Sequence, residues 1–177
     1  MDLIDYTIKN GKSAIVLIPE IALTYQTVMR FTRRFKEKVS IVNSRMSAGE
    51  KYDQFERAKK GEISIMIGPR SALFTPFKNL GLIVIDEEHE SAYKSESVPK
   101  YHAIEVAQKR GVDTGAAIVL GSATPSLESY YRAKKGIYKF HKLTSREKGN
   151  LPTVSIVDLR EELKNDNKSI FSVKLSE

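Results

Sequence analysis

The sequence predicts an α/β fold in which helices cover both faces of a parallel sheet. Short apolar runs, typical of buried strands, alternate along the chain with longer amphipathic runs, typical of helices. The apolar run 82–85 ends abruptly in three carboxylates and a histidine, residues 86–89. Polar groups just past the carboxyl end of such a strand lie where open α/β sheets bind ligands.

Each predicted element has a local signal. Strands are expected at 14–18, 39–42, 63–67, 82–85 and 117–120. Helical segments are expected at 20–36, 47–60, 102–110 and 126–135, with Gly111 and Gly136 closing the last two. Ser47 and Glu50 form a capping box, which marks the start of the second helical segment.

Composition limits the class of protein. The chain has 177 residues, 41% of them hydrophobic, which fits one soluble domain. No apolar stretch is long enough to span a membrane and no signal-peptide pattern is present, so we expect a protein that is neither membrane-spanning nor secreted. The absence of cysteine excludes disulfides and thiolate metal sites, and the three histidines lack metal-ligand spacing. The net charge of +7 favours an anionic partner such as nucleic acid.

The pattern changes near residue 144. We expect residues 1–144 to form the main domain, and residues 145–177 to be a linker and the start of another element. Residues 144–152 are polar and turn-rich, residues 154–159 have the composition of one more strand, and residues 160–177 are highly polar.

The acidic stretch after strand 82–85 resembles the Walker B arrangement of an NTPase. Asp86 can hold a nucleotide-bound Mg²⁺, usually through water, because this ion takes a few carboxylates together with phosphate oxygens. Glu87 can orient or deprotonate the attacking water. The alternative is an acidic surface turn after a core strand.

A second motif, Gly121-Ser122-Ala123-Thr124, follows strand 117–120. Its small residues let the backbone approach the site, and the hydroxyls of Ser122 and Thr124 can hydrogen-bond the neighbouring acids. The alternative is a plain turn in which Thr124 or Ser126 caps the next helix. Together with the acidic stretch, this segment resembles motif III of superfamily 2 helicases.

Three further loops follow predicted strands and carry candidate contacts to nucleic acid. Hydroxyls and cations suit phosphate, and aromatics interleaved with lysine suit base stacking. The alternatives are a proline at a helix start, an ordinary loop and a mobile surface loop. The candidate DNA-binding residues from this chemistry are Arg70, Ser71, Tyr93, Lys94, Tyr101 and His102. The segment after strand 14–18 resembles motif Ia of helicases, which contacts the nucleic-acid backbone, and this resemblance adds Pro19, Glu20 and Thr24.

One apparent phosphate-binding motif is misleading. Gly11-Lys12-Ser13 matches the end of a P-loop, but the first glycine of that motif would fall at Tyr6. A P-loop follows a strand and opens a helix, whereas this segment closes a helix and opens a strand. We therefore predict a helix end here rather than a phosphate site.

Together these segments closely resemble the primosomal protein N′ family of replication-restart DNA helicases, in superfamily 2. The matching segments are 18–24, 70–74, 79–82, 86–89, 93–94, 101–103 and 121–126. The resemblance extends to about residue 171. It implies the first RecA-like lobe, with the P-loop NTPase fold, of an ATP-driven 3′-to-5′ DNA helicase that acts in primosome assembly.

The resemblance also implies residue roles, cofactors and partners. Asp86 would hold Mg²⁺, Glu87 would activate water, and His89 with Ser122 and Thr124 would couple the nucleotide state to the grip on DNA. The implied cofactors are ATP and Mg²⁺, with a zinc site only outside this chain. The implied partners are single-stranded and forked DNA, primosome proteins and single-strand-binding proteins.

The sequence departs from the family pattern at Asn43, Pro69 and the pair Ile104-Glu105, where the family usually has His, Thr and Arg-Asp. These changes affect a phosphate-binding hydroxyl and a charged loop contact and leave the acids intact. The family's P-loop lies just before the helix near Met1, so we expect a lobe truncated at its amino end and inactive as an ATPase alone. The alternatives are another superfamily 2 translocase lobe and a non-catalytic DNA-binding module.

Loss of the P-loop strand would leave one side of strand 117–120 without a partner. We expect this edge either to be filled by residues 154–159 or to form a homo-oligomer between copies of the chain.

Overall fold

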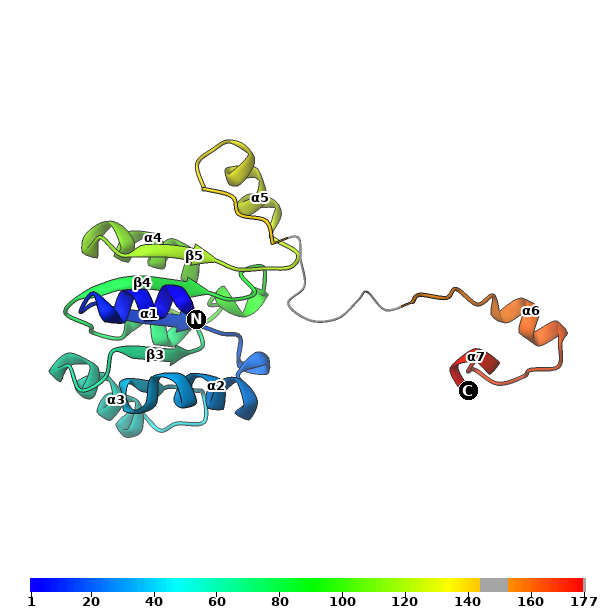
Figure 1. The fold of residues 1–177 in the computed structure, drawn as a ribbon, viewed down its shortest axis with the longest axis horizontal. Helices are drawn as coiled ribbons and strands as arrows, with labels where there is room; N and C mark the ends of the chain where they lie inside the picture. The colour runs from blue at the N-terminus through cyan, green and yellow to red at the C-terminus, as the bar shows by residue number, and fades with distance from the viewer. Residues whose placement is uncertain (144–152, 177) are drawn as a thin grey trace. The chain divides into compact units, whose positions relative to one another are not determined.

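A five-stranded, all-parallel sheet in the order β2-β3-β1-β4-β5 organises the structure, a computed structural model that describes residues 1–143 and 153–176 (Figure 1). The strands are β1 (Ser13–Leu17), β2 (Val39–Ile41), β3 (Ile65–Gly68), β4 (Leu80–Ile85) and β5 (Ala117–Leu120). All five predicted strands of the main domain are therefore present, with ends shifted by one or two residues.

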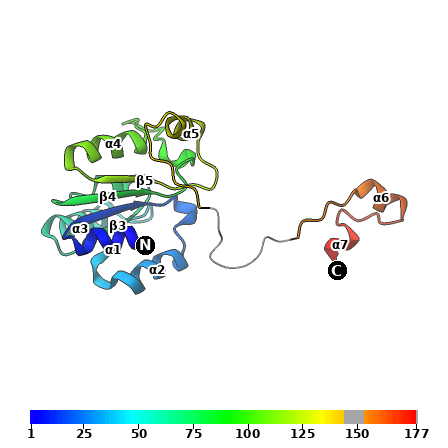
Figure 2. The ribbon, with the colours of Figure 1, turned by 45° about the horizontal axis from the view of Figure 1, so that its top comes forward.

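Helices cover both faces of this sheet, as predicted. One apolar cluster joins the sheet to α1 and α2, and a second joins its other face to α3 and α4. Figure 2 shows α1 and α4 on opposite sides of the strands. The helices are α1 (Asp2–Lys9), α2 (Tyr25–Phe35), α3 (Ala48–Lys60), α4 (Ala103–Thr114) and α5 (Leu127–Lys134).

Alternation along each strand explains why the sequence shows continuous apolar runs. In β1, Ala14 and Val16 pack into the cluster under α1 and α2, whereas Ile15 and Leu17 pack into the cluster under α3 and α4. A parallel strand covered on both faces needs apolar side chains in both directions. The core is thus two layers, one on each face of the sheet.

Helix ends follow the local signals in one case and depart from them in another. Ser47 caps α3, with the Glu50 N–H donating to Ser47 Oγ at 3.2 Å and the Ser47 N–H donating to Glu50 Oε2 at 2.7 Å. The prediction that Gly111 closes α4 is wrong, because the helix continues to Thr114 and ends at Gly115. Gly111 is buried, and a Cβ there would lie 2.8 Å from Ile118 Cδ1, so this glycine allows α4 to pack closely on β5.

The segment Gly11-Lys12-Ser13 lies between the end of α1 and the start of β1, as predicted. Gly11 has a φ of +68°, the left-handed conformation that commonly ends a helix. It lies at the amino edge of the parallel sheet, opposite the edge that carries the acidic stretch. This position excludes a phosphate loop beside Asp86 at this segment.

Residues 140–177 form a second unit, separate from residues 1–139. Its described helices are α6 (Leu159–Lys164) and α7 (Val173–Ser176). The predicted strand at 154–159 is wrong, because residues 153–158 have no regular structure and Leu159 begins α6. Asp158 caps that helix by accepting from the Arg160 N–H at 2.9 Å.

The sheet edge at β5 is therefore not filled by residues 154–159. Val154 and Ile156 are 81% and 96% exposed, and β-forming residues make a strand only where a neighbouring strand receives them. Among the described residues, β5 pairs with β4 alone and is the last strand of the sheet.

Candidate functional site

The candidate site is built at the carboxyl edge of the sheet, where four strand ends lie at one level. Leu17 is in register with both Gly68 and Ile85, and Ile85 is in register with Leu120. The loops that follow β1, β3, β4 and β5 therefore start side by side. These loops hold all the predicted nucleotide and DNA residues.

Backbone hydrogen bonds hold the acidic turn, residues 86–89, between the ends of β1 and β5. The Asp86 N–H donates to the Leu17 carbonyl at 2.9 Å, and the Glu88 N–H donates to the Gly121 carbonyl at 3.0 Å. The Asp86 side chain is exposed. Gly121 lies directly beside this carboxylate, because a Cβ at residue 121 would be in van der Waals contact with Asp86 Oδ1, at 3.5 Å.

Glu87 sits at the tip of this turn in a strained conformation. Its φ is +48°, a left-handed value that costs about 1–2 kcal/mol for a residue with a Cβ. The Glu87 N–H donates to Asp86 Oδ1 at 3.1 Å, and Glu87 Oε2 lies 3.7 Å from His89 Nδ1. The tight turn thus brings a half-buried carboxylate beside an imidazole.

His89 connects the acidic turn to the loop after β5. Its Nδ1 and Ser122 Oγ are 2.7 Å apart, and the Thr124 N–H donates to Ser122 Oγ at 3.0 Å. The structure therefore brings His89, Ser122 and Thr124 together as predicted. The expected hydrogen bonds from the Ser122 and Thr124 hydroxyls to the acids are not those observed. The Ser122 hydroxyl contacts His89 instead, and Thr124 takes part through its backbone N–H.

Glu88 is a site residue for which the sequence suggested no separate role. Its side chain is 3% exposed, and its carboxylate accepts from the Ser126 N–H at 2.6 Å, Ser126 Oγ at 3.1 Å and Ser129 Oγ at 2.9 Å. An anion is favourable at a helix N-terminus, and a buried carboxylate needs such donors. Glu88 therefore fastens the acidic turn to the first turn of α5, which Ser126 also caps.

Tyr93 was predicted to stack on DNA bases, and its placement contradicts that role. The residue is 1% exposed, and its hydroxyl donates to the Asp86 carbonyl at 2.6 Å. Burial raises the pKa of the Tyr93 phenol, and the carboxylates of Asp86, Glu87 and Glu90 raise it further. Tyr93 is thus a neutral support beneath the acidic turn, because no ring face is open to a base.

Arg70 holds the loop that follows the acidic turn. Its Nη1 donates to the Ala92 carbonyl at 3.0 Å and to the Lys94 carbonyl at 2.9 Å. The Tyr101 ring packs edge-on against Phe74, with 5.3 Å between ring centroids. Arg70 therefore shapes the loop, while the exposed Lys94 side chain remains accessible.

The remaining predicted DNA residues also have structural partners. His102 caps α4, its Nδ1 accepting from the Ile104 N–H at 3.3 Å. Thr24 caps α2 and is exposed, Pro19 is buried, and Ser71 lies half-buried in the turn Arg70–Phe74. Contact of these residues with DNA stays a prediction.

Glu20 ties the loop after β1 to the loop after β2. Its carboxylate accepts from the Ser44 N–H at 2.7 Å. This hydrogen bonding lowers the pKa of Glu20 below its ordinary value. The loop that carries Glu20 is therefore braced before any ligand binds.

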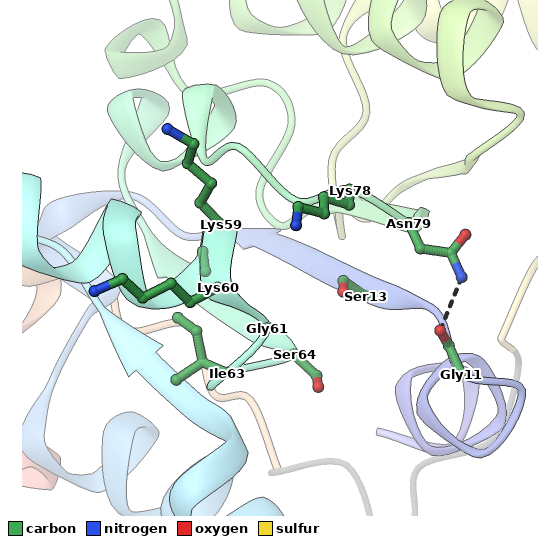
Figure 3. Close-up of a pocket in the computed structure, with 10 residues that line it drawn as sticks. Gly11, Ser13, Lys59, Lys60, Gly61, Ile63, Ser64, Lys78 and Asn79 are labelled. Carbon is green, nitrogen blue, oxygen red and sulfur yellow. Dashed lines mark hydrogen bonds between the residues drawn. The ribbon is translucent and has the colours of Figure 1, made fainter.

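The pocket in Figure 3 lies at the opposite, amino edge of the sheet. It has a volume of about 210 Å³ and is bordered by the starts of β1, β3 and β4 together with the end of α3. Lys59, Lys60 and Lys78 line it. It is thus remote from Asp86 and forms no part of the acidic site.

A sequence profile of the DEAD/DEAH box helicase family matches residues 2–133. The chain belongs to this family, and its sheet is the RecA-like α/β fold that the sequence predicted. Among the solved structures, the Pyrococcus furiosus Hef helicase domain matches with a TM-score of 0.46 and 19% identity, over 75% of this chain and 27% of that one.

Curated relatives identify the particular kind of helicase that the chain resembles. It is 53% identical to the replication restart protein PriA of Bacillus subtilis (strain 168) over 175 residues, which cover 98% of this chain and 22% of that protein. It is 49% identical to the Chlamydia pneumoniae protein of the same name over 168 residues, 93% of this chain and 22% of that protein. The chain thus spans about a fifth of the length of these relatives.

Proposed function

We propose that this chain is the part of an ATP-dependent 3′-to-5′ DNA helicase that faces the nucleotide and grips DNA during replication restart. The observation that carries the proposal is the His89–Ser122 contact of 2.7 Å, which joins the acidic turn to the loop after β5. Relatives named as replication restart proteins support the biological setting.

The residues of the acidic turn fit a nucleotide with its metal ion. Asp86 offers an exposed carboxylate, and the neighbouring Gly121 has no side chain that could hinder the approach of phosphate oxygens. No group of three or more acidic or histidine side chains within residues 1–143 and 153–176 is placed to hold a metal alone. Nucleotide oxygens would therefore complete the coordination of Mg²⁺, which supplies charge stabilisation to the phosphates when bound.

Glu87 is the proposed general base. Its half-buried carboxylate would orient the attacking water and accept its proton. His89 lies 3.7 Å from Glu87 and bonds Ser122, so movement of the acid on hydrolysis would reach the loop after β5. Glu88 would pass that movement on to α5.

DNA would lie along the loops at the carboxyl edge of the sheet. Lys94 is exposed there, Thr24 is exposed at the start of α2, and Tyr101 and His102 are half-buried beside them. The net charge of +7 favours such a polyanion. We include single-stranded and forked DNA, primosome proteins and single-strand-binding proteins as partners of the whole protein, which would act in the bacterial cytoplasm. Separately, none of the helices that the structure describes is long and apolar enough to cross a membrane.

We also propose that the isolated chain self-associates through β5. Among the residues that the structure describes, this strand ends the sheet, and the groove beside it is lined in part by Leu3 and Tyr6 of α1 together with Ala117. An open apolar edge is a template for pairing with a second chain.

A chimaera tests the proposed helicase role. The aligned 175 residues of the B. subtilis relative are replaced by those of this chain, and DNA-stimulated ATP hydrolysis is measured. Glu87→Gln is expected to lower kcat by at least about 100-fold. Glu37→Gln, which removes an exposed carboxylate from the turn after α2, is the matched control. Equal turnover of the two variants would contradict the role of Glu87.

A further inference from the structure

The pentapeptide Arg-Ala-Lys-Lys-Gly occurs twice in the chain, at 57–61 and at 132–136. Each copy ends a helix, the first α3 and the second α5. Lysines at a helix C-terminus are favourable in both places, because they complement the helix dipole. The two copies therefore share their local chemistry, and any difference between them comes from their surroundings.

In α3 two of the three cations of this pentapeptide lie close to carboxylates. Arg57 Nε lies 3.5 Å from Glu62 Oε2, and Lys59 Nζ lies 3.5 Å from Glu56 Oε1. Ala58 is buried in the core. This copy is partly neutralised.

In α5 the same three cations meet aromatic rings. Lys134 Nζ lies 5.4 Å from the centre of the Tyr130 ring, and Lys135 Nζ lies 5.6 Å from that of Tyr131. A ring attracts a cation without neutralising its charge. Both ammonium groups therefore keep a net positive charge that can attract an anion.

The third cation of this copy is fixed by Tyr138. Arg132 lies 5.7 Å from the Tyr138 ring, and its Nη1 is 2.8 Å from the Tyr138 hydroxyl oxygen. Gln108 Nε2 of α4 also donates to this oxygen, at 2.5 Å. These contacts hold the turn after α5 against α4 and keep the Arg132 guanidinium beside the Tyr138 ring.

Charge and exposure continue beyond the pentapeptide. Residues 129–146 contain six Lys or Arg residues, one His and no acid. Tyr131 is 60% exposed, and α5 projects from the sheet beyond the end of β5 (Figure 1). Exposed aromatics interleaved with cations are the pattern that binds single-stranded nucleic acid, with rings under bases and cations on phosphates.

We propose that this segment binds single-stranded nucleic acid through an α5 face, which comprises Tyr130, Tyr131, Arg132, Lys134, Lys135, Tyr138 and Lys139. The inference rests on the proposed function in one respect, that the chain acts on DNA. It adds a contact separate from the loops after β1, β3 and β4. Because Glu88 bonds Ser126 and Ser129, this contact is mechanically joined to the acidic turn.

The repeated pentapeptide supplies a matched experiment on the chain itself. Binding of a fluorescein-labelled oligo-dT is followed by anisotropy at several salt concentrations for two double variants. Lys134→Ala with Lys135→Ala is expected to weaken binding at least about fivefold at low salt and to lower the salt slope by roughly 1.4. Lys59→Ala with Lys60→Ala removes the same charge from the same sequence and is expected to change affinity less than about twofold, because those lysines lie at the opposite edge of the sheet. Equal losses in the two variants would overturn the proposal.

Tyr131 tests the stacking part. Tyr131→Phe keeps the ring and is expected to bind as the wild type does, whereas Tyr131→Ala is expected to lose about fivefold or more. Equal binding by the two Tyr131 variants would overturn the stacking assignment. Competition gives a second test: polyglutamate added at the same concentration of negative charges as the oligonucleotide should not displace it, and displacement would also overturn the assignment. If the two double lysine variants lose the same affinity for oligo-dT while Glu87→Gln still stops ATP turnover by the chimaera, this inference fails and the proposed function stands.

Discussion

The carboxylate of Glu88 accepts a hydrogen bond from the Ser126 N–H at 2.6 Å, across 38 residues of sequence. A buried acid in the strand-end turn is thereby satisfied by the first turn of the helix that follows the next strand. Two Ser hydroxyls, from Ser126 and Ser129, complete its environment. The acidic turn and α5 are in this sense one structural unit.

Glu88→Ala should release α5 from the sheet. The substitution leaves three donors at the helix start without their acceptor, which costs about 2 kcal/mol of unfolding free energy. Urea denaturation measures the loss, and amide hydrogen exchange should rise over residues 127–134. Glu128→Ala, an exposed acid on the same helix, is the control and should cost less than about 1 kcal/mol. Unchanged exchange in the Glu88 variant would show that other contacts hold α5.

Tyr93→Phe should remove the hydrogen bond to the Asp86 carbonyl and destabilise the fold by about 1–2 kcal/mol at neutral pH. The pKa of Tyr93 is raised in the folded state, first by burial, so folding favours the neutral phenol. That contribution is full below about pH 10, where an unfolded tyrosine ionises, and is lost as the pH rises further. The stability difference between wild type and variant should therefore shrink above about pH 10. Tyr52→Phe, at an exposed ring, is the control; a difference that grows with pH would contradict the assignment.

Much of the fold could be predicted because its signals are local. The capping box of Ser47 and Glu50 spans a single helical turn, and the apolar runs report strands buried on both faces. The carboxyl-edge site follows from the parallel order of those strands. Residues at strand ends, such as Asp86 and Ser122, were therefore placed correctly by pattern alone.

The parts that could not be predicted depend on contacts distant in sequence. Nothing near Tyr93 indicates that its hydroxyl bonds the Asp86 carbonyl, so an aromatic in a lysine-containing loop looked like a base-stacking residue. The donors to the Glu88 carboxylate and the close packing of Gly111 on Ile118 also depend on residues distant in sequence. Residues 154–159 show the converse, because β-forming composition without a receiving strand did not make a strand.

Lys94→Ala and Arg70→Ala should weaken binding to single-stranded DNA for different reasons. Lys94 offers exposed charge, so its loss should lower the salt slope by roughly 0.7 and leave the loop intact. Loss of Arg70 removes donors to the carbonyls of Ala92 and Lys94, so amide exchange across residues 91–102 should rise as well. Anisotropy titrations and exchange mass spectrometry separate the two. An Arg70 variant with normal loop exchange and weaker binding would assign Arg70 to direct phosphate contact.

Self-association through β5 should depend on protein concentration and on the side chains of that edge strand. Light scattering is expected to show a mass above that of the 20.0 kDa monomer as concentration rises. Ala117→Lys places a charge on the exposed start of β5 and should restore the monomer, because charges on edge strands oppose pairing. Tyr52→Lys, on the surface of α3, is the control. A monomer at every concentration in the wild type would refute the edge interface.

The isolated chain should hydrolyse ATP only at background rate, although Asp86 and Glu87 lie together in the acidic turn at the carboxyl edge of the sheet. Phosphate affinity in this class of enzyme comes mainly from P-loop amides and a lysine. Within the described residues, Gly11-Lys12-Ser13 is the segment that matches the end of that motif, and it lies at the amino edge of the sheet, away from Asp86. Glu87→Gln should consequently change nothing in a phosphate-release assay of the chain, in contrast to its effect in the chimaera. Strong ATP hydrolysis by the chain that Glu87→Gln abolishes would show that phosphate is bound by a route other than a P-loop.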